Sequence, residues 1–143
     1  MVKTASTKEK KKQVLDLERE VSFLLSEKVL KKEREQQILK NRYGLFGLDI
    51  KTLEEIGRNL KITRERVRQI EKSALGKVAN AASKIESLNN FFIKVENTIN
   101  QTGGVINEER LVSKFINTKN QDQKNVNAFL FLARLNRKIS KHN

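Results

Sequence analysis

The chain has 143 residues, enough for one domain of ordinary size or two small ones. Its 30 Lys and Arg residues outnumber 17 Asp and Glu, and the net charge of +13 favours nucleic acid as the partner, ahead of an anionic membrane surface. Cysteine is absent and the single histidine is His142. These counts argue against disulfides, zinc fingers, thiol nucleophiles and histidine-based metal sites. No apolar stretch approaches ~18 residues, so we expect a cytoplasmic protein without a membrane span or secretory signal.

The first half of the chain begins with a basic arm and continues with helices. Residues 1–12 are polar and lack periodicity, which predicts a disordered arm, either a solvated tail or a tether that seeks phosphate. Apolar residues then recur at three- and four-residue intervals from about Lys12, which predicts a helix carrying Val14, Leu17, Val21 and Leu24. A second helix is predicted from about Lys32 to Tyr43, where Gly44 ends it.

Two capped helices follow at close spacing. Thr52 and Glu55 have the spacing of a capping box, and Thr63 is a second N-cap candidate. Two such helices, the second markedly basic, are the outline of a helix-turn-helix. The apolar rhythm after Thr63 continues to Leu88, which predicts one long helix with a weak point at Gly76.

Residues 86–143 hold five of the seven phenylalanines, which predicts a second small domain with its own aromatic core. We expect a helix ended by Gly103 and Gly104 and a short strand at Val105 and Ile106. A helix capped by Asn107, a polar loop over 117–120 and a final helix carrying Val126 to Leu135 follow.

Four polar residues share one face of the basic helix. At ~100° per residue they fall within an arc of ~140°, opposite the apolar residues. They are Arg64, Glu65, Arg68 and Gln69. These side-chain types read base edges in the major groove, where arginine binds guanine, glutamine adenine and glutamate cytosine. The alternative is a solvated charged face.

A family resemblance decides between these two interpretations. TLEEIGRNLKITRERVRQIEKSAL resembles region 4 of housekeeping bacterial sigma factors, the domain that reads the promoter −35 element, and EREQQILKNRYGL resembles its first half. The resemblance covers roughly residues 30–78. It implies that Arg64, Glu65, Arg68 and Gln69 read bases. It also implies DNA backbone contacts, to which Lys72 is added from its position near the face; the backbone set is Arg34, Arg42, Thr52, Leu53, Glu54 and Lys72.

The resemblance has further implications. A hydrophobic concavity of the family holds the flap of the polymerase β subunit, and Leu39 and Ile56 would help to form its walls. Sigma regions that melt promoters are expected to be missing, so the chain would carry the −35 reader alone. Residues 86–143 resemble, more weakly, the HARE-type winged helix of the polymerase delta subunit, with a short or incomplete wing after Leu135. A generic three-helix packing module is the alternative for this half.

We therefore expect an all-α protein with an arm at 1–12, a sigma region 4-like helix-turn-helix domain at 13–85 and a winged-helix-like module at 86–143. The expected function is sequence-specific binding of double-stranded DNA in transcription regulation, at the nucleoid, without enzymatic activity, cofactor, metal, membrane or small-molecule substrate. The alternative is an adaptor that binds the RNA polymerase β flap or another transcription factor. RNA binding is disfavoured, because the chain has one Tyr and no Trp for base stacking.

Overall fold

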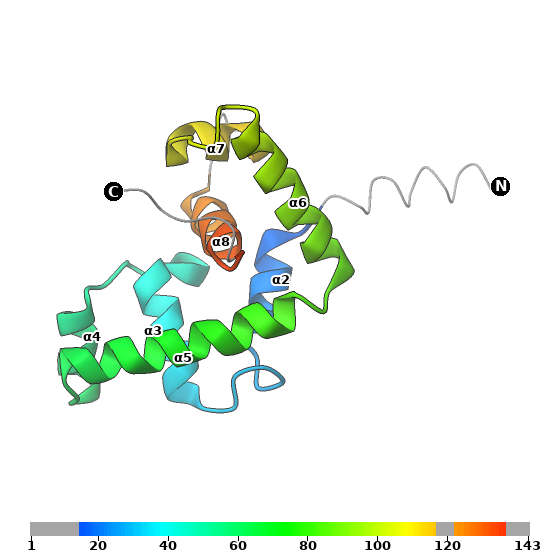
Figure 1. Ribbon diagram of the computed structural model, residues 1–143. Helices are drawn as coiled ribbons and strands as arrows, with labels where there is room; N and C mark the ends of the chain where they lie inside the picture. Colours follow the sequence, from blue (N-terminus) through cyan, green and yellow to red (C-terminus); the bar gives the residue numbers. More distant parts are fainter. Residues whose placement is uncertain (1–14, 117–121, 137–143) are drawn as a thin grey trace.

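The computed structural model describes residues 15–116 and 122–136, and these form seven α-helices and one 3₁₀ helix without any strand (Figure 1). The helices are α2 (Leu17–Leu24), α3 (Glu33–Tyr43), η1 (Leu45–Gly47), α4 (Leu53–Leu60), α5 (Arg64–Ala82), α6 (Glu86–Asn100), α7 (Glu108–Phe115) and α8 (Gln123–Arg134). The all-α prediction is confirmed. The basic arm at 1–12 and the polar loop at 117–120 lie outside the described residues. None of the helices described here is long and apolar enough to cross a bilayer.

The predicted start of the first helix near Lys12 is wrong, because α2 begins at Leu17, where the Asp16 side chain caps it by accepting from the Arg19 amide.

The predicted bounds of α3 and of the start of α4 are confirmed, and local chemistry explains them. α3 ends where Gly44 takes the left-handed conformation, with φ of 62°. A Cβ atom at Gly44 would lie 2.7 Å from Ile50 Cγ1 and 2.8 Å from Asn127 Nδ2, so only glycine fits. Before α4, the Thr52 side chain accepts a hydrogen bond from the Glu55 amide, and the Glu55 carboxylate accepts one from the Thr52 amide. This is the capping box that the sequence predicts.

The predicted long helix to Leu88 is wrong, because α5 ends at Ala82 and α6 begins at Glu86 in a different direction (Figure 1). The amides of residues 84 and 85 bond carbonyls three residues back, and the Asn89 side chain donates to the Ser83 carbonyl at 2.9 Å. The break turns Leu88 back into the core, where it is fully buried. Gly76 lies inside α5 and does not interrupt it.

The predicted strand at Val105 and Ile106 is also wrong. Gly103 and Gly104 have φ of 80° and 90°, and the chain runs from them into α7 without pairing to any strand in the described ranges. Val105 is 62% exposed, so its side chain is not packed against a sheet or a core as the side chain of a buried strand would be. The cap of α7 is confirmed, because the Asn107 side chain accepts from the Arg110 amide at 2.8 Å.

The main hydrophobic core is continuous from α2 to α8. α8 lies in the middle of the molecule, surrounded by α2, α3, α6 and α7 (Figure 1), and packs closely on α2 and η1. Aromatic contacts within the second half join Phe91, Phe115 and Phe129. The same cluster of buried side chains includes Leu24 of α2 and Leu45 of η1. The domain boundary between residues 85 and 86 stays a prediction, and the core crosses it.

A second, smaller cluster holds the helix-turn-helix together. It joins α3, α4 and α5 through four buried side chains, Ile38, Ile56, Val67 and Ile70. Gly57 lets α4 approach the turn closely, because a Cβ atom there would lie 2.7 Å from the Ile62 carbonyl oxygen. The orientation of α5 relative to α4 therefore depends on this contact.

Candidate nucleic-acid interface

The N-terminus of α5 presents the four predicted base-reading side chains to solvent. The Thr63 side chain caps the helix by accepting from the Arg66 amide at 3.0 Å. Val67 and Ile70 fix one face of the helix against α3 and α4. The opposite face exposes all four predicted readers in the first two turns, Arg64, Glu65, Arg68 and Gln69.

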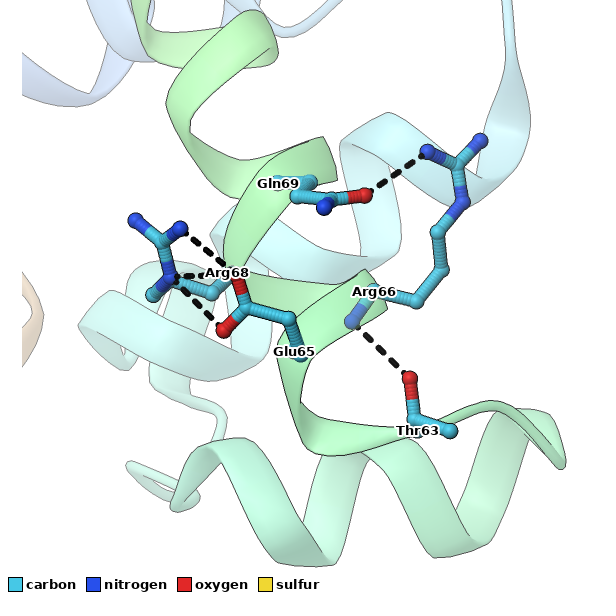
Figure 2. A network of polar contacts seen from close by, with 5 residues as sticks. All are labelled: Thr63, Glu65, Arg66, Arg68 and Gln69. Atoms are coloured by element: carbon cyan, nitrogen blue, oxygen red, sulfur yellow. Dashed lines mark hydrogen bonds and ion pairs between the residues drawn. The ribbon is translucent and has the colours of Figure 1, made fainter.

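Glu65 and Arg68 form a forked ion pair across this face (Figure 2). Arg68 Nε lies 3.2 and 3.0 Å from the two Glu65 carboxylate oxygens, and Arg68 Nη2 lies 2.6 Å from Oε1. The hydrogen bonds from Arg68, with its positive charge, lower the pKa of Glu65, and the same contacts raise the pKa of Arg68. Because both groups are exposed, the pair is weak and easily exchanged for other partners.

The other two readers also have partners within the protein. Gln69 Oε1 accepts from Arg66 Nη1 at 3.4 Å (Figure 2), and Arg64 Nη1 lies 3.4 Å from Glu54 Oε1. Arg66 is absent from the predicted set, although it is exposed and reaches the last reader. Its three-residue spacing to Gln69 is the sequence signal that could have found it.

Most of the predicted backbone contacts converge at the N-terminus of α4. A shallow hollow of about 350 Å³ is lined by Arg42, Thr52, Leu53, Glu54 and Arg64. The first amides of a helix have no intrahelical partner and carry the positive end of its dipole. The hollow therefore combines two guanidinium groups with helix amides, an arrangement that suits a phosphate group. The negative charge of the Glu54 carboxylate disfavours a phosphate in this hollow, but the Glu54 side chain already forms an ion pair with Arg64.

The remaining two predicted backbone contacts lie apart from this hollow. Arg34 is exposed in the first turn of α3, and Lys72 is exposed on α5, one turn beyond Arg68. Neither lines the hollow. Lys72 is on the same side of α5 as Glu65 and Arg68 at ~100° per residue, so it extends the positive face along the helix.

Arg42 is held in place by two acceptors. Its Nε lies 3.3 Å from Glu71 Oε2, and its Nη1 donates to the Lys51 carbonyl at 3.4 Å. The second Glu71 oxygen accepts from the Tyr43 hydroxyl at 3.2 Å. Arg42 also lines a larger groove of about 910 Å³ that runs between α3, α5 and the C-terminal helices. Arg42 is therefore the residue that the hollow at the N-terminus of α4 and this larger groove have in common.

The walls expected for a flap-binding concavity are part of the core. Leu39 is fully buried in the cluster that contains α8, and Ile56 is 2% exposed in the helix-turn-helix cluster. Neither side chain is open to a partner in this conformation. Across the described parts of the chain, no group of three His, Cys, Asp or Glu side chains could hold a metal ion.

The family comparison agrees with the helix-turn-helix geometry. Residues 32–80 match the family model described as Sigma-70, region 4. RNA polymerase sigma factor SigA4 of Synechococcus elongatus is 54% identical over 46 residues, SigA of Nostoc is 56% identical over 45 residues and RpoD of Helicobacter pylori is 53% identical over 47 residues. The predicted resemblance to sigma region 4 is confirmed for this segment, which folds as a helix-turn-helix.

These matches cover a limited part of every protein concerned. Each covers 32% of this chain, and the chain spans 15%, 12% and 7% of the three relatives in the order given. The family match ends at residue 80 and leaves the winged-helix resemblance of 86–143 without support. No solved structure is significantly similar to the chain.

Proposed function

We propose that this protein binds double-stranded DNA in a sequence-specific manner and reads a −35-type promoter element in transcription regulation. The observation that carries the proposal is the exposed reading face on the first two capped turns of α5, within a sigma region 4 domain. A recognition helix that enters the major groove uses the side chains of its N-terminal turns. The proposal involves no catalysis, and it places the protein on the DNA of the nucleoid.

The geometry supports a division between reading and positioning. The Arg64, Glu65, Arg68 and Gln69 side chains would meet base edges, and the hollow at the N-terminus of α4 would hold a phosphate. Before DNA arrives, the exposed Arg68 side chain is paired with Glu65. Arg68 can exchange part of that contact for guanine acceptors, because a solvated ion pair is easily replaced.

The decisive experiment is selection of preferred duplexes from a random pool, followed by binding of the Arg68→Ala variant. We expect a −35-like hexamer, and Arg68→Ala should weaken binding to it by roughly 5- to 150-fold, with relaxed preference at one or two base pairs. Arg19→Ala, which removes an exposed arginine from α2, is the matched control and should keep the preference. A pool without a motif, or equal weakening on all sequences, would contradict direct reading.

A second candidate is an adaptor that binds RNA polymerase through its β flap. The observation that favours a protein partner is the exposed apolar segment after α3, where Phe46 is 37%, Leu48 44% and Ile50 63% exposed. The burial of Leu39 and Ile56 argues against the family's concavity as the docking surface. Binding of the purified flap domain to the full chain, with Ile50→Ser as the test variant, separates this function from DNA binding.

A further inference from the structure

We propose that the C-terminal helix α8 positions Arg42 for its phosphate contact, acting through Tyr43 and Glu71. The inference rests on the proposed function, since it concerns a residue of the predicted DNA backbone contacts. It assigns to residues beyond the sigma region 4 segment a role that requires no contact between them and DNA. Figure 1 shows α8 packed beside the end of α3, where Arg42 and Tyr43 lie.

The first link joins α8 to Tyr43. The rings of Tyr43 and Phe131 lie 5.2 Å apart between centroids, and Arg134 Cζ lies 5.5 Å from the Tyr43 centroid. Phe131 is 1% exposed, so its ring has little freedom to move. Aromatic pairs and cations over aromatic rings are both favourable in these distance ranges. α8 therefore fixes where the Tyr43 ring lies.

The second link joins Tyr43 to Arg42 through one carboxylate. Tyr43 donates to Glu71 Oε1 at 3.2 Å, and Arg42 donates to Glu71 Oε2 at 3.3 Å. The Glu71 side chain is 15% exposed and that of Arg42 is 34% exposed. A carboxylate bonded through both oxygens in a partly buried place keeps one orientation, so the guanidinium of Arg42 keeps one as well. The Nη2 group and the second N–H of Nη1 can then donate to a phosphate in the hollow at α4, which Arg42 lines.

α8 also fixes the backbone next to Tyr43. Asn127 is buried, and its Nδ2 donates to the Gly44 carbonyl at 2.9 Å. Gln123 donates to Asn127 Oδ1 at 2.9 Å and thereby orients the amide. Gly44 immediately follows Tyr43 and ends α3. α8 therefore holds both the side chain and the chain direction at the end of the helix that carries Arg42.

A double-mutant cycle in the full chain tests the coupling. Tyr43→Phe keeps the ring and removes only the hydroxyl, and Arg42→Gln removes the phosphate contact. Tyr43→Phe should weaken binding to the selected duplex by roughly 2- to 12-fold, the value of one ordinary hydrogen bond. In the Arg42→Gln background the same substitution should have no further effect, because it acts through Arg42. Arg42→Gln should make the negative slope of log affinity against log salt shallower by about 0.9, because one phosphate contact is lost.

Arg134→Gln tests the α8 end of the chain of contacts. Arg134 is exposed, so its replacement should leave the fold intact, which circular dichroism checks. The matched control is Arg110→Gln, which removes the same charge from an exposed site on α7. We expect Arg134→Gln to weaken binding more than the control does, and to lose that excess when Arg42 is already glutamine.

The outcomes separate the coupling from the proposed function. Equal weakening by Tyr43→Phe in both backgrounds, or equal effects of Arg134→Gln and Arg110→Gln, would overturn the role of α8 and leave DNA binding intact. If Arg42→Gln leaves both the affinity and the salt slope unchanged, Arg42 does not contact a phosphate, and this part of the proposal is refuted. A chain that selects no DNA motif would refute the proposed function, and the inference with it.

Discussion

Two glycine-to-alanine substitutions test the close contact that sets the helix-turn-helix angle. At Gly57 of α4, a Cβ atom would lie 2.7 Å from the Ile62 carbonyl oxygen and 3.5 Å from the Arg64 amide nitrogen. At Gly76 of α5, nothing lies within 4 Å of the added atom. Both positions are inside helices, so alanine gains about 1 kcal/mol of helix propensity at each. The difference between the two variants therefore isolates the cost of the contact.

We expect Gly76→Ala to raise the free energy of unfolding by about 0.5–1 kcal/mol. Overpacking costs about 1–3 kcal/mol, so Gly57→Ala should be less stable than Gly76→Ala by that amount. The contact involves backbone on both sides, so α4 and the turn must move apart to relieve it. Urea unfolding followed by circular dichroism measures both values. If Gly57→Ala stabilises the protein as much as Gly76→Ala does, the close approach of α4 to the turn is refuted.

Three further predictions concern caps, pH and salt. Thr63→Ala and Asn107→Ala should each lower the free energy of unfolding by about 1 kcal/mol in urea titrations, and Thr63→Ala alone should weaken specific DNA binding. Burial and the nearby Glu71 carboxylate raise the pKa of Tyr43 to about 12, so the stability that its protonated form provides should persist below pH 10 and disappear as the pH rises through 12. Tyr43 is the only tyrosine and tryptophan is absent, so ultraviolet absorbance follows its titration directly, and a midpoint near 10 would contradict its burial. Deleting residues 1–12 should make the salt dependence of DNA binding shallower without changing the motif, and an unchanged slope would identify the arm as a solvated tail.

Features set by a few neighbouring residues were predictable from the sequence. The capping box of Thr52 and Glu55, the cap at Thr63 and the stop at Gly44 all arise from interactions within one turn. The exposed placement of the reading face follows from helical periodicity, once Val67 and the other apolar residues are buried. The pairing of Arg68 with Glu65 at three residues' distance follows from the same helical spacing.

Features set by distant packing were not predictable. The apolar rhythm continues in register through the break at residues 83–85, so periodicity alone favours one long helix. Leu88 is buried in the same cluster as side chains of α7 and α8, and this packing between distant parts of the chain is not contained in the local periodicity. The hydrogen bond from Asn127 to the Gly44 carbonyl joins residues 83 apart in sequence, and no local sequence pattern indicates it. The contact between Tyr43 and Phe131 is of the same kind.

The continuous core predicts what happens when residues 86–143 are removed. Leu24 of α2 is fully buried, Leu45 of η1 is 1% exposed, and α8 packs closely on both elements. Exposing one such side chain costs about 1.5–3 kcal/mol, and a few of them approach the total stability of about 5–15 kcal/mol that is typical of a domain. A fragment of residues 13–85 should therefore unfold at a lower temperature than the full chain and lose affinity for DNA through unfolding. Thermal denaturation of the two chains, beside their DNA affinities at one salt concentration, makes the comparison. An equally stable fragment would mean that the helix-turn-helix domain is independent of α8, and that the buried contacts between them contribute little to its folding.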